Sequence, residues 1–164
     1  MEQLLGANPF NILPHLAALA IAYALAFPIG WNREKNERSA GLRTFPLVAV
    51  AACGVIQATE SLLASSPEGM ARIIEGLIVG MGFIGGGAIL RHDESVQGTA
   101  TAASLWVTGA IGAAVGVGSY DVALVLAVAT IATLWVMEPL KRVGHLDSKA
   151  QAAADKRHRG KSGG

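Results

Sequence analysis

Long apolar stretches alternate with short polar segments along the first 140 residues of the chain. A transmembrane helix needs about 20 mostly apolar residues to cross a hydrocarbon core of about 30 Å, and five stretches reach this length. The pattern therefore predicts an all-α membrane protein, a bundle of five transmembrane helices. The predicted spans are residues 12–30, 44–64, 67–90, 99–117 and 122–140.

The segments between these spans carry recognisable helix boundaries. A charged stretch over residues 31–43 separates the first two spans, and a short polar loop is expected at 91–98. Ser66 followed by Pro67 predicts the start of the third helix, because Ser is a favoured N-cap and Pro fits the first helical position. A tight turn is expected at 118–121, which is rich in turn-forming residues.

Basic residues fall almost entirely on one side of the predicted bundle. The segments after the first and third spans and the C-terminal segment contain all but one of the 13 Lys and Arg residues, and the exception is Arg72. Because Lys and Arg accumulate in cytoplasmic segments, we expect an outer N-terminus and a cytoplasmic C-terminus. Residues 1–140 are predicted to form one membrane domain, and residues 141–164 a basic, disordered cytoplasmic tail.

Composition agrees with a membrane protein and narrows the function. Charged residues make up 15% of the chain, well below the roughly one quarter typical of soluble domains. Residues 1–15 contain no Lys or Arg, which argues against a cleaved signal peptide. The single cysteine, Cys53, excludes a disulfide framework and is expected to be buried. No motif for phosphate binding, nucleophilic catalysis or zinc proteolysis is present, so we expect no enzyme, no cofactor and no nucleic-acid partner.

Glycine is concentrated in the third and fourth predicted spans. Two pairs in the third span and one in the fourth have G-x-x-x-G spacing, which lets helix backbones approach closely in lipid. We expect six glycines to form helix-packing contacts: Gly76, Gly80, Gly82, Gly86, Gly112 and Gly116. The run at 85–87 weakens a helix, at about 1 kcal/mol per Gly relative to Ala. It indicates either tight packing, the favoured interpretation, or a break in the helix.

Glu75 is an acidic residue expected within the membrane, two turns into the third span. A charged group at this depth costs a few kcal/mol and usually faces a partner or a cavity. Glu75 is therefore a functional candidate, as a ligand for a metal cation or as a proton carrier. Arg72 lies three residues earlier, so an ion pair on one helix face is an equal alternative.

Polar residues elsewhere add further candidates. Ser104 and Thr108 lie one turn apart in the fourth span, where they indicate interhelical hydrogen bonds or, as a less favoured alternative, the lining of a polar path. The charged segment 31–43 contains Arg33 and Arg43. It is either a solvated loop or a docking site for a protein partner or anionic lipid.

Three strings in this order resemble the MgtC/SapB family of bacterial membrane proteins. They are AGLRT at 40–44, GMGFIGGGAIL at 80–90 and VQGTATAASLWVT at 96–108. The resemblance implies a five-span inner-membrane protein with an outer N-terminus. The family is linked to growth in scarce magnesium and, in pathogens, to survival within host cells. Its members resemble regulators of other membrane proteins more than magnesium carriers.

The chain departs from the family pattern at two positions. The family's first loop usually begins with Gly, one further residue and Glu-Arg, whereas here Asn32 stands in the acidic position. The third span usually carries an amide where this chain has Glu75. Arg33, Arg43 and Thr44 match the pattern and are carried over as functional candidates. Longer members have a soluble C-terminal domain, which we expect this chain to lack.

Two hypotheses for function follow. The first is a regulator that docks through its helix faces and cytoplasmic segment onto a membrane-protein partner, adjusting membrane transport and magnesium or phosphate homeostasis when magnesium is scarce. The second is an oligomeric transporter or channel for magnesium or another cation, with Glu75 and the hydroxyl groups of the fourth span lining its path. Five short spans bury little surface within a lipid bilayer, so we expect a homodimer.

Overall fold

The computed structural model of the 164-residue chain describes residues 12–36, 41–63, 65–92 and 95–136. By its internal contacts the chain divides into two units, Met1–Thr130 and Ile131–Gly164. The described part of the second unit is 131–136, the last residues of a helix. The predicted domain boundary at residue 140 and the predicted tail at 141–164 lie outside the described residues.

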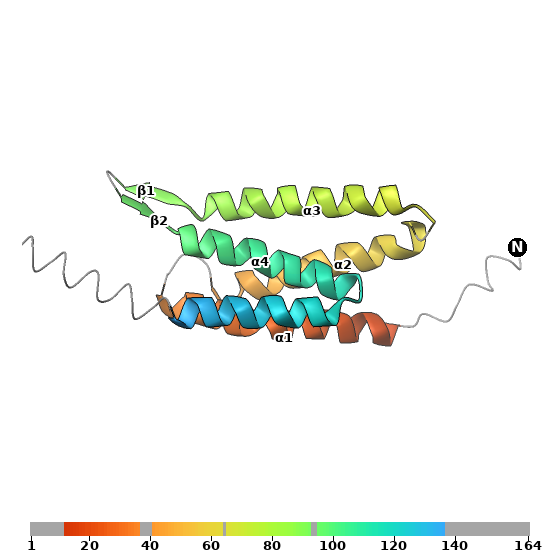
Figure 1. Cartoon of the computed structure of the whole chain (residues 1–164), viewed down its shortest axis with the longest axis horizontal. Helices are drawn as coiled ribbons and strands as arrows, with labels where there is room; N and C mark the ends of the chain where they lie inside the picture. Colours follow the sequence, from red (N-terminus) through yellow and green to blue (C-terminus); the bar gives the residue numbers. More distant parts are fainter. Residues whose placement is uncertain (1–11, 37–40, 64, 93–94, 137–164) are drawn as a thin grey trace, which may run out of the picture. The chain divides into compact units, whose positions relative to one another are not determined.

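Helices make up most of the described structure, as the predicted all-α class requires (Figure 1). Their bounds are α1 Ile12–Asn36, α2 Thr44–Leu63, α3 Pro67–Gly87 and α4 Thr99–Gly116, followed by a helix over Tyr120–Val136. By length and composition, α1, α3 and α4 are able to cross a membrane, while α2 and the last helix contain shorter apolar segments. Each of the five predicted spans contains a helix, although residues 88–90 of the third span and Val117 of the fourth lie outside helices.

The first helix extends beyond its predicted end. The sequence predicted a loop from Trp31, where charged residues begin, but α1 continues to Asn36. Asn32 and Arg33 are only 8% and 6% exposed, and Arg33 Nη2 donates a hydrogen bond to Asn32 Oδ1 (3.1 Å). The burial of Asn32 and Arg33 therefore outweighs the polar character of this segment, although Glu34 and Lys35 are exposed.

The third helix begins at its predicted cap and ends slightly before its predicted end. Ser66 is the N-cap, and its Oγ accepts a hydrogen bond from the Gly69 N–H (3.2 Å), while Pro67 occupies the first helical position. The glycine run at 85–87 forms the last turn, and Ala88 follows as the C-cap. The run thus marks the end of α3, and no break occurs inside the helix.

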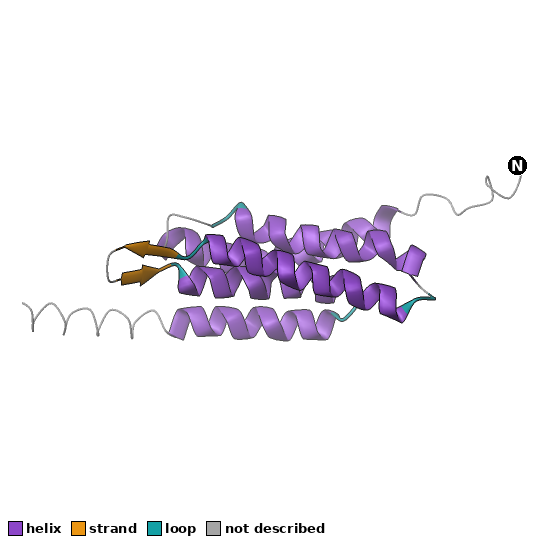
Figure 2. Cartoon of the chain, turned by 90° about the horizontal axis from the view of Figure 1, so that it is seen from above, coloured by secondary structure: helices purple, strands orange, loops and turns teal. Residues whose placement is uncertain are grey.

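A two-stranded antiparallel hairpin stands where the sequence predicted a loop between α3 and α4. β1 (Leu90–His92) pairs with β2 (Ser95–Gln97), and the hairpin projects past the ends of the neighbouring helices (Figure 2). The pairing gives backbone groups of both segments hydrogen-bond partners. Gly98 follows with φ +84°, and a Cβ there would meet the carbonyl oxygen of Ala88, so this position requires glycine.

The fourth helix occupies the centre of α1–α4 and contacts each of the other three. Its buried residues cover about half of its circumference, and Ala103 and Trp106 on the opposite side are exposed. On α3, by contrast, the buried residues are Met81 and Gly85. α3 therefore lies at the outside of this group, alongside α4 (Figure 1).

Candidate functional site

The second and fourth helices meet backbone to backbone. A Cβ at Gly112 would meet the carbonyl oxygen of Ala49. A Cβ at Gly116 would lie 2.7 Å from Ile56 Cβ and 3.1 Å from the carbonyl oxygen of Cys53. Two rows of small residues thus face each other, as in closely packed membrane helices. The structure places two of the six predicted packing glycines at this contact, which we call the α2–α4 seam.

The glycines of α3 have different surroundings. A Cβ at Gly85 would lie 3.1 Å from the carbonyl oxygen of Ala102 on α4, and the Met81 sulfur fills the space beside Gly109. A Cβ would meet no atom within 4 Å at the other four glycines predicted to pack: Gly76, Gly80, Gly82 and Gly86. Close packing by these four is not seen among the described residues, and it stays a prediction for contacts with another molecule.

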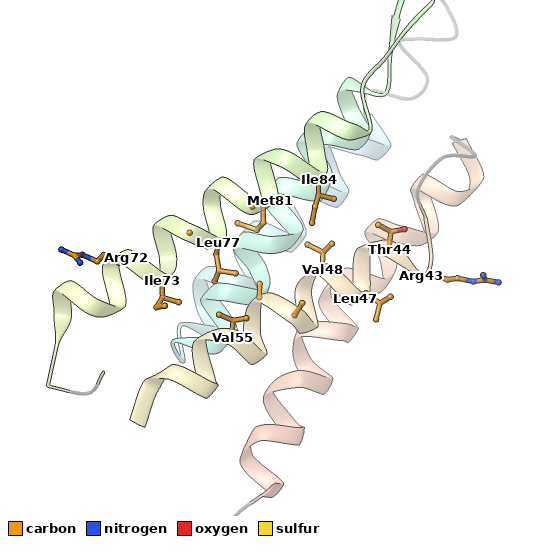
Figure 3. Close-up of a pocket in the computed structure, with 14 residues that line it drawn as sticks. Arg43, Thr44, Leu47, Val48, Val55, Arg72, Ile73, Leu77, Met81 and Ile84 are labelled. Atoms are coloured by element: carbon orange, nitrogen blue, oxygen red, sulfur yellow. The ribbon is translucent and has the colours of Figure 1, made fainter. Parts of the chain in front are cut away.

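A groove of about 630 Å³ runs between α2 and α3. Leu47, Val48 and Val55 contribute from α2, and side chains of α3 face them across the groove (Figure 3). Apart from Arg43, Thr44 and Arg72, every lining residue is apolar or glycine. No pattern in the sequence predicted this groove. The small residues of the two helices were the one sequence feature that could have indicated the groove. Four of them line it: Ala51, Ala52, Gly76 and Gly80.

The polar residues of the groove lie at its two ends. Arg43 and Thr44 lie at one end and Arg72 at the other, and both arginine side chains extend away from the apolar middle (Figure 3). Thr44 begins α2, and its N–H donates to the carbonyl oxygen of Gly41 (3.0 Å). The structure thus brings the candidates Arg43 and Thr44 together at one mouth of the groove.

The turn before Arg43 is held by residues of α1. A Cβ at Gly30 would lie 3.2 Å from the carbonyl oxygen of Gly41, and a Cβ at Gly41 would meet the Glu34 carboxylate. Glu34 Oε2 accepts a hydrogen bond from the Leu42 N–H (3.1 Å). Glu34 was not among the predicted functional residues, yet its carboxylate holds the backbone that leads into Arg43. Glycines on both sides permit this close approach.

Glu75 lies on a different face of α3 from the groove. Successive helical residues are rotated by about 100° around the helix axis. The Glu75 side chain therefore points in a different direction from the neighbouring Gly76, which lines the groove. Within the described part of the chain, no ion pair joins Glu75 to Arg72, and both residues are exposed. Exposed residues spaced to share its face form what we call the outer face of α3: Glu75, Val79, Gly82 and Gly86.

The hydroxyl groups of α4 bond to their own helix. Ser104 Oγ donates to the carbonyl oxygen of Ala100 (2.6 Å), and Thr108 Oγ1 donates to that of Ser104 (2.8 Å). Both residues are buried, and neither lines the groove. Bonding to the backbone one turn earlier satisfies a buried hydroxyl without a second helix. Both bonds lie within α4, whereas the sequence indicated hydrogen bonds between helices.

Metal-ligating side chains are scattered in the described part of the chain. No group of three or more His, Cys, Asp or Glu side chains comes together there in a way that could hold a metal ion. A metal ion at Glu75 would therefore need ligands from outside the described residues, such as a second copy of the chain.

The sequence of this chain is similar to those of known proteins. A profile described as MgtC family matches residues 19–143. Protein MgtC of Salmonella typhi is 34% identical over 142 residues, which is 86% of this chain and 60% of that protein. Protein MgtC of Brucella abortus (strain 2308) is 39% identical over 132 residues, 80% of this chain and 55% of that protein.

A shorter relative is covered more fully. Protein SrpB of Synechococcus elongatus is 33% identical over 140 residues, which is 78% of this chain and 77% of that protein. The chain spans about 60% of the length of the Salmonella relatives that it matches. No solved structure shows significant similarity to it.

Proposed function

This chain belongs to the MgtC family, and on that basis we propose that it is a multi-pass regulator in the bacterial inner membrane. In this proposal it adapts membrane transport and magnesium homeostasis to scarce magnesium through contacts with partner membrane proteins. Family membership supports the membrane location and the link to magnesium. The exposed outer face of α3 supports the contacts.

We further propose five membrane spans with the N-terminus outside and the C-terminus in the cytoplasm. Three long apolar helices and two shorter ones support the number of spans, and the distribution of Lys and Arg supports the orientation. Alkaline phosphatase, which is active only outside the cytoplasm, is expected to be inactive when fused after residue 164 and active when inserted at residue 65. The reverse result at either position would contradict this topology.

The observation that carries the regulatory proposal is the exposed carboxylate of Glu75 on the outer face. In the proposed topology it lies within the hydrocarbon region, where an uncompensated charge at the centre of a helix costs roughly 2.5–3.5 kcal/mol or more. A partner helix with a hydrogen-bond donor opposite Glu75 would remove much of that cost. Gly82 and Gly86 on the same face would let such a helix approach closely.

Co-purification from native membranes tests this role. The unmodified chain is expected to capture a reproducible partner membrane protein, and Glu75→Gln and Gly82→Leu are each expected to reduce the captured amount about tenfold. Glu68→Gln is the matched control, because it removes a carboxylate from the first turn of the same helix. Repeated purification of folded protein without a partner would contradict the proposal.

The alternative function is an oligomeric transporter for magnesium or another cation. The position of Glu75 favours it, since a symmetric assembly through the outer face would bring carboxylates of several copies together. Magnesium flux into proteoliposomes separates the two functions. A regulator gives no flux, whereas a transporter gives flux that Glu75→Gln abolishes.

We propose that the chain is a homodimer, which light scattering of the purified protein in detergent would test.

A further inference from the structure

We propose that the groove between α2 and α3 binds one anionic phospholipid. The phosphate would lie against Arg43 and Thr44, and one acyl chain would run along the groove toward Ile73. This site is independent of the regulatory role proposed above. Only its assignment to the cytoplasmic leaflet rests on the proposed topology.

The chemistry of the groove matches an acyl chain. Its lining between the two polar ends is entirely apolar or glycine, so it offers no hydrogen-bond partner to a polar ligand. Its volume of about 630 Å³ falls within the roughly 300–1,000 Å³ typical of small-molecule sites. In a membrane, an apolar groove of this kind lies beside lipid chains that can enter it without a desolvation cost.

The groove has the length of one lipid leaflet. It follows α2 from Arg43 to Val55 and α3 from Ile84 to Arg72, about 18 Å in each case at a rise of about 1.5 Å per residue. One leaflet supplies half of a hydrocarbon core about 30 Å thick, whereas a transmembrane helix crosses all of it. An acyl chain of one leaflet therefore fits the groove from end to end, and a partner helix would extend beyond it.

The charge at one mouth of the groove selects an anionic headgroup. A guanidinium group forms paired hydrogen bonds with phosphate oxygens, and the hydroxyl of Thr44 beside Arg43 supplies another donor. Among the described residues no acidic side chain lines the groove, and the Glu34 carboxylate at the neighbouring turn accepts a hydrogen bond from the Leu42 N–H. In the proposed topology this mouth faces the cytoplasm, whose leaflet carries the anionic lipids.

Native mass spectrometry of the full chain in detergent tests the headgroup. The protein is titrated with phosphatidylglycerol or with phosphatidylcholine of the same acyl chains. We expect about fivefold tighter binding of phosphatidylglycerol, which corresponds to about 1 kcal/mol for one basic residue near an anionic lipid. Arg43→Gln is expected to remove this preference and Arg43→Lys to retain most of it. Arg72→Gln, at the other end of the same groove, is the matched control and should leave it unchanged.

Substitutions inside the groove test the acyl chain. Gly80→Leu places a large side chain in the groove, where a Cβ meets no atom within 4 Å, and should weaken binding of both lipids about tenfold. Gly82→Leu, on the outer face, should leave lipid binding unchanged while it reduces partner capture. The lipid site and the regulatory role can therefore fail separately.

Three results would overturn the lipid site. The first is a preference for phosphatidylglycerol that survives Arg43→Gln or that depends on Arg72 instead. The second is full lipid binding by the Gly80→Leu variant in folded protein. The third is a photoactivatable phosphatidylglycerol that crosslinks to the outer face of α3 and not to the α2 segment at 47–55.

Discussion

α3 and α4 follow each other in the chain and are both rich in glycine, yet they have opposite surroundings. Ten of the 18 residues of α4 are buried, against two of the 21 residues of α3. Both helices carry G-x-x-x-G pairs. In α4 the pair lies against the backbone of α2, whereas in α3 both pairs lie open. Glycine spacing therefore indicates that another helix can approach closely, and it does not identify that helix.

The residues that face the glycines explain why the pair in α4 is closely packed and the pairs in α3 are open. Gly112 and Gly116 lie against Ala49 and Cys53, small residues one turn apart on α2. Close packing of membrane helices requires small residues in register on both sides. Gly76 and Gly80 also face α2, but the groove separates them from it. A close contact therefore needs matching rows on two helices, and one row alone leaves a space.

Gly112→Ala is the strongest test of this comparison. The added Cβ would overlap the carbonyl oxygen of Ala49, a backbone atom that cannot rotate away. We expect a loss of about 3 kcal/mol in the free energy of unfolding, at the upper end of typical overpacking costs. Thermal unfolding of the purified protein in detergent measures it. An unchanged midpoint would mean that α2 and α4 are not in backbone contact.

Gly85→Ala tests the closest backbone approach of α3. A Cβ there would lie 3.1 Å from the carbonyl oxygen of Ala102, so α3 must shift slightly away from α4. We expect a loss of about 1 kcal/mol, because part of the overlap is offset by the better helix propensity of Ala. The same unfolding measurement applies. A cost equal to that of Gly112→Ala would show that α3 packs as tightly as α4.

Gly82→Ala is the matched substitution on the open face and should have the opposite sign. No atom lies within 4 Å of the added Cβ, and Ala replaces Gly in a helix interior with a gain of roughly 0.5–1 kcal/mol. The unfolding midpoint should therefore rise slightly. A fall in the midpoint of a purified dimer that is absent in the monomer would reveal a second copy packed on the outer face.

Thr108→Val should have the smallest effect. The hydroxyl donates only to the carbonyl oxygen of Ser104 in the same helix, and such bonds add little to helix stability. We expect a change of about 0.5 kcal/mol or less in the free energy of unfolding. A larger loss of unfolding free energy would indicate that the hydroxyl contacts another helix. It would then support the alternative in which α4 lines a polar path.

Local sequence signals predicted the helix starts well. α2 and α4 begin at the predicted Thr44 and Thr99, and the Ser66 cap and Pro67 start of α3 are both confirmed. The predicted membership of the MgtC family is also confirmed. A helix start depends on a few neighbouring residues that bond to their own backbone, so the sequence contains most of the required information.

The features that the sequence did not predict depend on how segments pack or pair with one another, which the pattern of a single segment does not specify. The predicted end of α1 was wrong because Asn32 and Arg33 are buried in the fold, although the charged residues that begin there are typical of a loop. The strands at Leu90–His92 and Ser95–Gln97 pair with each other, although most of their residues are polar and typical of a loop. The groove and the orientation of Glu75 depend on how α3 is rotated against α4, which no single segment specifies. Family resemblance supplied Arg43 and Thr44 as candidates without indicating that they share a groove.

The groove also has a mechanical consequence. α3 is joined to α2 by the few residues between Leu63 and Pro67, and to α4 through the hairpin of β1 and β2. These short connections keep both ends of α3 close to their neighbours while its side toward α2 is loosely packed. The area that the protein occupies in the plane of the membrane then depends on the separation of α2 and α3. In the proposed topology, lateral pressure in the bilayer would act on that separation, and an acyl chain in the groove would oppose its narrowing.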